Sequence, residues 1–374
     1  MKFVLRTAAL LCAPLIALSA CSSTATQPTD ATSSAGSAAS ATQSADINAS
    51  GEISVTNCGK TLSLPGPAKK MYINDGNIIA LALAAGAHKE ITAVSSLGRD
   101  IPVLKQKYGA EVVDGLNEVS KDYPTLESIL AAAPDLVVAG WNYGFSEGKN
   151  LTPDILKERG IPSYLLTESC RQEGSNKRGI VDPWEAVRID INNLGAITGH
   201  ADTAKGVIED MDQRLSALEK AAKPEKQPVV FVFDSAKDTI FTSGSFGAPN
   251  AIIEAAGGVN AAADVDDTWT TVSWEKLATA KPDIIAFVEY PGQSYEDKVQ
   301  ILKEHPVSKD FPAVAEERFV NLPYALWTES PMNIDAAEYL RKAFEQHKLA
   351  PESDVKIHLD MPAELPGLGK LPKK

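Results

Sequence analysis

The chain has 374 residues, of which 44% are hydrophobic and 23% charged, and its formal net charge is −13. Beyond an N-terminal signal, a body of about 300 residues exceeds the usual size of one hydrophobic core, so two lobes are expected. The excess of negative charge argues against a surface for nucleic acid or for an anionic membrane.

The first twenty residues have the build of a secretory signal. Lys2 and Arg6 form a basic start, and residues 7–17 are mostly apolar but too few to span a bilayer as a helix. The small residues before Cys21 resemble the lipobox of bacterial lipoproteins, in which the cysteine thiol is acylated and becomes the new N-terminus. The sequence therefore predicts a signal peptide over residues 1–20 and a lipid anchor, including palmitate, on Cys21. An ordinary cleaved signal with a chance cysteine is the alternative.

Residues 21–50 combine this cysteine with a segment rich in Ser, Ala and Thr. Such a segment cannot bury enough apolar surface to offset the entropy of ordering it, and it is typical of a flexible tether. No later stretch approaches eighteen uninterrupted apolar residues. We therefore expect the folded body to lie on the extracytoplasmic face of the cell membrane, attached through lipid alone.

Two cysteines remain for the folded body, because Cys12 leaves with the signal and Cys21 carries lipid. In an exported protein, Cys58 and Cys170 are expected to form one disulfide. Two free buried thiols are the alternative, since the sequence does not show whether the two Cα atoms approach within bonding range.

Short apolar runs alternate with helical patterns through residues 51–181, which we assign to an N-terminal lobe. Residues 53–64 alternate around a turn and predict a small hairpin. The remaining predicted strands are residues 70–74, 91–94, 136–139 and 164–166, and the predicted helices are residues 77–85, 126–132 and 153–158. This alternation predicts a parallel sheet with helices on both faces.

The longest helical pattern runs from Pro183 to about Ala222, with a predicted dividing loop around residues 199–202. We assign residues 182–222 to a linking helix between the lobes. The predicted fold class is α/β, with two lobes of mainly parallel sheets and flanking helices joined by this one long backbone helix.

A C-terminal lobe is predicted over residues 223–350, where strands and helices alternate again. Its predicted strands are residues 229–233, 284–288 and 319–322, and its predicted helices are residues 248–256, 275–281 and 335–347. The tail over residues 351–374 is rich in Pro and Lys and is expected to be flexible or packed on the surface.

The two predicted lobes share a local signature. Glu127 lies seven residues before Pro134, and Glu275 lies seven residues before Pro282; each proline is followed by Asp and a buried strand. The equal spacing favours duplicated lobes over a chance similarity of helix-to-strand turns.

Together with residues 241–244 and 252–260, this signature resembles the periplasmic-binding family that serves iron-siderophore, haem and corrinoid uptake transporters. The resemblance covers residues 53–349. It implies a monomeric substrate-binding protein that delivers a small ligand to an ABC permease, whose ATPase is a separate subunit. It also implies that Glu127 and Glu275 dock on permease arginines, giving one charge-assisted contact per lobe. Both are also first-turn glutamates, which the helix dipole favours.

In such sheets, ligands bind at loops beyond the carboxyl ends of the strands. Aromatic walls with Arg and hydroxyl groups there suit a bulky, partly anionic ligand, because the guanidinium fork pairs with carboxylate or phosphate oxygens. Loop arginines are also commonly solvated or paired, and aromatic residues also fill cores. The predicted ligand-binding residues are Asn74, Arg99, Trp141, Tyr143, Arg171, Ser245, Trp269, Tyr290, Tyr324 and Trp327.

The predicted ligand is a ferric siderophore or a similar chelate, whose iron is coordinated by the chelator and not by the protein. Haem, with Tyr143, Tyr290 or Tyr324 as axial ligand, a corrinoid and a phosphorylated deazaflavin coenzyme precursor are alternatives. Five scattered histidines argue against a direct metal site. The chain has no phosphate-cradling Gly loop, nucleophile elbow or zinc-protease helix, so neither an enzyme nor a cofactor beyond the lipid is expected.

Overall fold

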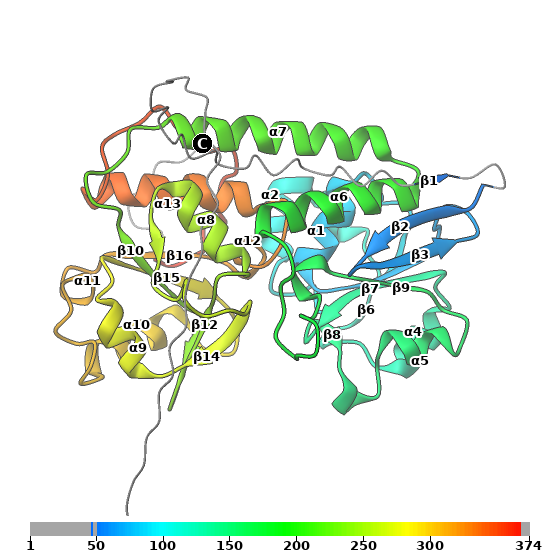
Figure 1. Ribbon diagram of the computed structural model, residues 1–374, viewed down its shortest axis with the longest axis horizontal. Coiled ribbons are helices and arrows are strands. Elements are labelled where there is room, and N and C mark those ends of the chain that lie inside the picture. Colours follow the sequence, from blue (N-terminus) through cyan, green and yellow to red (C-terminus); the bar gives the residue numbers. More distant parts are fainter. Residues whose placement is uncertain (1–45, 48–50, 368–374) are drawn as a thin grey trace, which may run out of the picture. The chain divides into compact units, whose positions relative to one another are not determined.

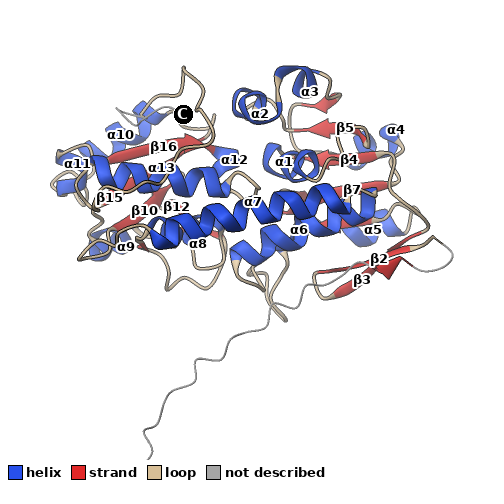
Figure 2. Cartoon of the chain, turned by 90° about the horizontal axis from the view of Figure 1, so that it is seen from above, coloured by secondary structure: helices blue, strands red, loops and turns tan. Residues whose placement is uncertain are grey.

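Two parallel sheets with flanking helices make up the two lobes of the molecule (Figures 1 and 2). The computed structural model describes residues 46–47 and 51–367, which belong to one compact unit. The predicted signal peptide and Cys21 lie outside these residues. Within the predicted tether, β1 (Asp46–Ile47) pairs antiparallel with β2 (Ile53–Asn57), so this short part is ordered as a strand.

The N-terminal lobe contains the predicted hairpin and a parallel sheet. The hairpin consists of β2 and β3 (Lys60–Leu64). The parallel strands are β4 (Met71–Asn74), β5 (Ile91–Ser95), β6 (Glu118–Ser120), β7 (Leu136–Trp141), β8 (Gly144–Phe145) and β9 (Ser163–Leu165), in the order β6-β5-β4-β7, with β8 and β9 both paired to β7. All four residues of β4 are buried, as expected of a central strand with both faces covered.

Helices follow most of these strands. They are α1 (Gly76–Ala84), α2 (Ile101–Tyr108), α3 (Ala110–Asp114), α4 (Leu126–Ala132) and α5 (Pro153–Lys157), with the 3-10 turns η1 (Glu147–Lys149) and η2 (Thr167–Ser169). Thr125 begins α4 by accepting a hydrogen bond from the N–H of Ser128 on its side-chain oxygen, and the N–H of Thr125 donates to Ser128 Oγ. This capping box places Glu127 in the first exposed turn.

The C-terminal lobe repeats the arrangement and adds a small antiparallel sheet. Its parallel strands are β10 (Val229–Phe233), β13 (Val259–Asn260), β15 (Ile284–Glu289) and β16 (Phe319–Pro323), in the order β13-β10-β15-β16. The antiparallel strands are β11 (Ser235–Ala236), β12 (Ile240–Ser243) and β14 (Trp269–Val272). Its helices are α8 (Ala248–Ala256), α9 (Trp274–Ala280), α10 (Tyr295–Glu304), α11 (Pro312–Ala315), α12 (Tyr324–Trp327) and α13 (Asn333–Gln346).

The linking segment forms two helices, α6 (Pro183–Thr198) and α7 (Ala201–Lys220), separated where the dividing loop was predicted. Gly199 ends α6 in the left-handed conformation, with φ of 84°, which glycine adopts without steric cost. Figure 1 shows α7 running over both lobes, and it contacts α1 as well as α8 and α13. The predicted α/β fold class is confirmed, and α7 is the helix that crosses between the lobes.

The tail is packed as far as the structure describes it. Val355, Ile357, Leu359 and Met361 are buried, and the Arg341 guanidinium donates a hydrogen bond of 2.7 Å to the carbonyl of Pro351. Residues 351–367 therefore belong to the C-terminal lobe. Among the helices that the structure describes, none has the length and apolar character needed to cross a membrane.

Candidate ligand site between the lobes

An open cavity of about 1000 Å³ lies where loops of the two lobes face each other, and we call it the interlobe cavity. The N-terminal lobe contributes Ser96, Gly98, Arg99, residues 121–125, Glu127 and Lys149, and the C-terminal lobe contributes residues 290–292. Most of these loops follow the carboxyl ends of β5, β6 and β15. The position agrees with the rule for ligand sites in parallel sheets, and the volume is at the upper end for organic ligands.

Arg99 forms the charged centre of this cavity. Its guanidinium pairs with the carboxylate of Asp75, donates a hydrogen bond of 3.1 Å to Ser96 Oγ, and lies 3.5 Å from Asp100 Oδ2. It also lies over the ring of Tyr324, 4.1 Å from the ring centroid. The positive charge of Arg99 is therefore already balanced within the protein.

Two tyrosine hydroxyls complete the surroundings of Asp75. Tyr123 donates to Asp75 Oδ2 at 3.2 Å from the N-terminal lobe, and Tyr324 donates to the same oxygen at 3.3 Å from the C-terminal lobe. Burial raises the pKa of Asp75, although Arg99 opposes the shift, and burial raises the pKa of Asp100 to about 7. The site therefore holds more buried carboxyl groups than cations.

The state of the tyrosines bears on the haem alternative. Burial raises the pKa of Tyr143 and of Tyr324 well above the ordinary value for phenols. Both side chains are also buried, neither lines the interlobe cavity, and the Tyr324 hydroxyl already donates to Asp75, which disfavours either as an axial ligand to haem iron there. Of the three tyrosines considered, Tyr290 is the one that lines the interlobe cavity.

Trp141 and Arg171 lie elsewhere. They border a second groove of about 790 Å³ beside the β2–β3 hairpin. The Arg171 guanidinium stacks 3.8 Å from the Trp141 ring centroid, and it pairs with Glu147 at 2.5 Å. Trp141 and Arg171, each predicted to bind the ligand, therefore line a different surface from Arg99.

Several predicted ligand residues make contacts inside the protein. Asn74 is fully buried and donates to the carbonyl of Tyr143 at 2.7 Å, and Trp327 is fully buried and donates to the carbonyl of Phe287 at 2.9 Å. The prediction is wrong for Asn74 and Trp327, because neither side chain has surface left for a ligand. Tyr143 is likewise buried, which also corrects its assignment.

Two predicted residues of the C-terminal lobe, Ser245 and Trp269, make contacts within that lobe. Ser245 Oγ donates to the carbonyl of Val265 at 3.1 Å, and Trp269 is buried with its ring stacked on Phe241 at 6.1 Å. Of the ten predicted residues, Arg99 and Tyr290 therefore line the interlobe cavity, and Tyr324 supports Arg99 from beneath.

The sequence analysis missed Asp75, Tyr123, Lys121 and Lys149. Asp75 directly follows Asn74 at the end of β4, so the strand-end rule points to both residues. The prediction named Asn74, whereas the side chain beside Arg99 is that of Asp75. Lys121 and Tyr123 follow β6, which has three residues and no apolar alternation to mark it.

Glu127 and Glu275 occupy matching places in the two lobes. Each is exposed in the first turn of its helix, α4 or α9. Hydrogen bonding to its own backbone N–H and then to Thr125 lowers the pKa of Glu127, and hydrogen bonding to Ser273 lowers the pKa of Glu275. Both carboxylates are therefore charged and accessible near neutral pH.

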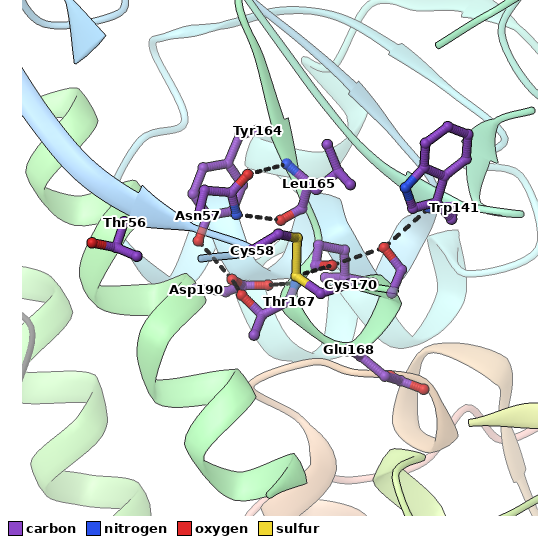
Figure 3. The surroundings of a disulfide bond; sticks show 12 residues. Thr56, Asn57, Cys58, Trp141, Tyr164, Leu165, Thr167, Glu168, Cys170 and Asp190 are labelled. Atoms are coloured by element: carbon purple, nitrogen blue, oxygen red, sulfur yellow. Dashed lines mark hydrogen bonds between the residues drawn. A yellow bond between two sulfur atoms is a disulfide. The ribbon is translucent and has the colours of Figure 1, made fainter. Parts of the chain in front are cut away.

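The structure joins Cys58 and Cys170 by a disulfide, with their Cα atoms 5.3 Å apart. Figure 3 shows the bridge beside Asn57, whose side-chain amide donates to the carbonyl of Leu165 at 2.7 Å and accepts from its N–H at 2.8 Å. These contacts attach the hairpin to the edge strand β9 of the sheet.

No group of three or more His, Cys, Asp or Glu side chains is placed to hold a metal ion within residues 51–367. The functional groups of the interlobe cavity are phenols, lysine amines, the carboxylates of Asp122 and Glu127, hydroxyls and the paired Arg99.

Two α/β lobes, a helix that crosses between them and a cavity at the strand ends define a solute-binding protein. The model of the family described as "Periplasmic binding protein" matches residues 74–326, more than half of the chain. The chain belongs to this family, which places it outside the cytoplasm as a solute-binding protein of an ABC transporter.

Among curated proteins, the chain is similar to a vitamin B12-binding protein of Yersinia pseudotuberculosis, with 26% identity over 60% of this chain and 71% of the relative. Among solved structures, a periplasmic binding protein of Veillonella parvula has a TM-score of 0.67 and 21% identity, over 80% of this chain and 99% of that one. An ABC-type Fe3+-hydroxamate transport protein of Saccharomonospora viridis has a TM-score of 0.65 and 20% identity, over 78% of this chain and 98% of that one. The relatives are described as binding or transport proteins, and the two structures support the fold.

Proposed function

We propose that this protein captures a ferric siderophore, or a chelate of similar size, in the interlobe cavity and delivers it to an ABC permease. The observation that carries the proposal is the cavity itself, which is about 1000 Å³, open, and walled by Tyr123 and Tyr290 from opposite lobes. Such a ligand supplies its own iron-coordinating atoms, so the protein needs only shape, aromatic contact and hydrogen bonds.

The charge of the cavity favours a ligand with little net charge. Arg99 is balanced by Asp75, and the cavity is lined by two lysines, Lys121 and Lys149, and by two acidic residues, Asp122 and Glu127. Three hydroxamate groups cancel the charge of Fe³⁺, so a ferric trihydroxamate is uncharged at its centre. A phosphorylated deazaflavin precursor stays an alternative, because Lys121 and Lys149 supply cations for a phosphate at the cavity wall.

A corrinoid is the second candidate. It is bulky and carries little net charge, and a vitamin B12-binding protein is among the relatives. Haem would bring two carboxylates to a cavity whose buried arginine is already paired.

Changing Tyr290 to Ala is expected to weaken ligand binding by roughly 10- to 100-fold, because an aromatic wall of the cavity is removed. Titration calorimetry with a ferric trihydroxamate, cyanocobalamin and haemin would identify the ligand and measure this loss. Trp141→Ala is the matched control, since Trp141 lines the second groove, and its affinity should stay within about twofold of the unchanged protein. An equal loss in both variants would place the ligand elsewhere.

Glu127 and Glu275 are proposed as the two docking contacts with the permease. Both are exposed and ionised, and they occupy the same turn of matching helices in the two lobes. One carboxylate on each lobe would fix the orientation of the complex on a permease with paired arginines.

Replacing both glutamates by Lys is expected to reduce uptake at least about tenfold, since attraction becomes repulsion at two contacts. Ligand uptake into cells or vesicles would measure it. Because Glu127 also lines the interlobe cavity and Glu275 does not, Glu275→Lys alone is the variant whose isolated protein should keep its affinity for the ligand. Glu219→Lys, on the exposed side of α7, is the control. Full uptake by the double variant would refute the docking proposal.

The anchor is also proposed, from the sequence before Cys21. A thiol acylated there and a tether behind it would hold a monomeric body near its permease. The intact mass of the mature protein distinguishes an acylated Cys21 from a free N-terminus.

A further inference from the structure

Two buried glutamates hold the lobes together behind the interlobe cavity. Glu168 lies in η2 of the N-terminal lobe, and Glu329 lies just after α12 of the C-terminal lobe; their exposures are 2% and 1%. The N–H of Glu168 donates to Glu329 Oε2 at 2.6 Å, and the N–H of Glu329 donates to Glu168 Oε2 at 2.8 Å. We call this reciprocal pair the carboxyl clasp.

The clasp continues into each lobe. On one side, Glu329 interacts with the buried carboxylate of Asp190 in α6. Asp190 accepts hydrogen bonds from the Tyr164 hydroxyl at 2.6 Å and from the N–H of Thr167 at 2.8 Å. On the other side, the carboxyl of Glu168 faces the indole of Trp269. Figure 3 shows the Glu168 side chain pointing away from the disulfide.

One proton satisfies an unpaired carboxylate oxygen of this network. Glu329 Oε1 is buried without a donor, and two carboxylates cannot hydrogen-bond to each other because neither has a hydrogen to give. If Glu329 carries a proton, its hydroxyl donates to Asp190, while Oε2 still accepts from Glu168. A protonated Glu329 therefore satisfies its own Oε1, whereas Glu168 Oε1 and the Trp269 indole N–H, also buried without a partner, face each other.

The surroundings favour that proton. Burial raises the pKa of Glu329, and repulsion by Asp190 and Glu168 raises it further. Arg178 is the cation that faces the clasp, through Glu168, and it also donates to the carbonyl of Trp269. The other titratable neighbours are the phenols of Tyr143 and Tyr164, whose pKa values burial also raises, so they stay neutral.

Hydrogen bonds connect the clasp, through the loop after α12, to the residues around Arg99. The Asn77 side chain in α1 donates to the carbonyl of Glu329 at 2.9 Å, which fixes the loop after α12 on the N-terminal lobe. Asn333 donates to the carbonyls of Leu326 and Thr328 and accepts from the N–H of Ser330, so this loop is braced as one unit. The same unit includes Tyr324, which lies beneath Arg99.

We propose that Glu329 is a positioning residue for ligand capture: with a proton it holds the two lobes closed at the clasp, and when it loses the proton the clasp opens. Proton loss places a further negative charge beside Asp190 and Glu168 in a buried site. Separation of the lobes there lets water reach these groups and moves Tyr324 relative to Arg99. The consequence for affinity rests on the proposed function, whereas the opening itself does not.

Hydrogen exchange of the unliganded mature protein tests the clasp directly, because the N–H groups of Glu168 and Glu329 are its donors. Between pH 5.5 and 8.5, exchange of peptides covering residues 166–170 and 328–332 should accelerate beyond the intrinsic base-catalysed rate. Between the ordinary pKa of an exposed glutamate and the raised pKa of Glu329 in the closed clasp, the extra acceleration should be roughly tenfold per pH unit. In Glu329→Gln, whose amide keeps a donor at every pH, this extra acceleration should be absent.

Asp234→Asn is the matched control. Asp234 is also a buried carboxyl with a pKa raised by burial, but it hydrogen-bonds to Ser235 within the C-terminal lobe. This variant should retain the pH dependence of the unchanged protein, and the peptide of β4 should report any global unfolding. Protection that is independent of pH in the unchanged protein, or equally dependent on pH in Glu329→Gln, overturns the clasp.

The effect on capture is measured separately with the ligand found by calorimetry. Affinity should fall over the pH range in which hydrogen exchange reports the opening of the clasp in the unchanged protein, and stay level in Glu329→Gln. Level affinity in the unchanged protein, with an opening clasp, overturns the positioning role. If no chelate binds at any pH, the proposed function fails, and the exchange result still decides whether the clasp exists.

Discussion

Replacing Cys58 and Cys170 together by Ser is expected to lower the free energy of unfolding by about 4–5 kcal/mol. The disulfide joins residues 112 positions apart, so its loss greatly increases the freedom of the unfolded chain. It also places a hydroxyl at the buried position of Cys170. Urea unfolding of the oxidised protein and of the double variant would measure the difference, and the slope m should rise because the unfolded state expands.

Two comparisons separate the covalent bond from its surroundings. The unchanged protein in excess reductant should lose a similar amount. Asn57→Ala removes the two hydrogen bonds to Leu165 beside the bridge and should cost only about 1–3 kcal/mol. A loss below about 1 kcal/mol in the double serine variant would mean that the unfolded chain is already restricted near these residues.

The repeated Glu-to-Pro-Asp signature explains why the fold could be predicted from sequence. In the N-terminal lobe, the Asp135 carboxylate accepts from the N–H groups of Lys69 and Lys70 at 2.8 and 2.9 Å. In the C-terminal lobe, the Asp283 carboxylate accepts from the N–H of Val229 at 2.9 Å. In both lobes the aspartate connects the start of one buried strand to its parallel neighbour, so equal spacing reflected equal structure.

The elements that were not predicted lack such local signals. β6 has three partly exposed residues, and its pairing with β5 depends on contacts that lie far apart in the sequence. The antiparallel sheet of the C-terminal lobe consists of β11, β12 and β14, whose strands have two to four residues each. Short strands carry too few alternating positions to be distinguished from loops.

The ligand site could be predicted only to the level of loops. The strand-end rule selected the loops that carry Arg99 and Tyr290, but it could not show which way a side chain points. The Trp327 side chain points inward because α12 packs against α1, and its indole N–H donates to the carbonyl of Phe287 in β15. The carboxyl clasp was beyond sequence reasoning, since its two members are separated by 161 positions.

The buried charges around Arg99 lead to the second large effect. Asp75 and Asp100 are both fully buried, and Arg99 is the cation that contacts each of them. Removing one partner of a buried ion pair leaves the other charge without compensation, which costs more than the pair contributes. Arg99→Met keeps the apolar stem against Tyr324 and removes only the charged head.

Arg99→Met is expected to destabilise the protein by about 3–5 kcal/mol at pH 8, and by less at pH 5. The freed carboxyl groups have pKa values raised above those of the unfolded chain, so the variant binds protons on folding and loses stability as pH rises. Urea unfolding at both pH values would measure this.

Arg171→Met is the matched control for that loss, because its partner Glu147 is 60% exposed and the exposed pair should contribute at most about 1 kcal/mol. Adding Asp75→Asn to Arg99→Met should restore part of the lost stability, since the most directly paired charge is then absent. A loss equal at both pH values would contradict the buried-charge explanation. Weak ligand binding by Arg99→Met would therefore not identify Arg99 as a ligand contact, and Tyr290→Ala gives the cleaner test of the cavity.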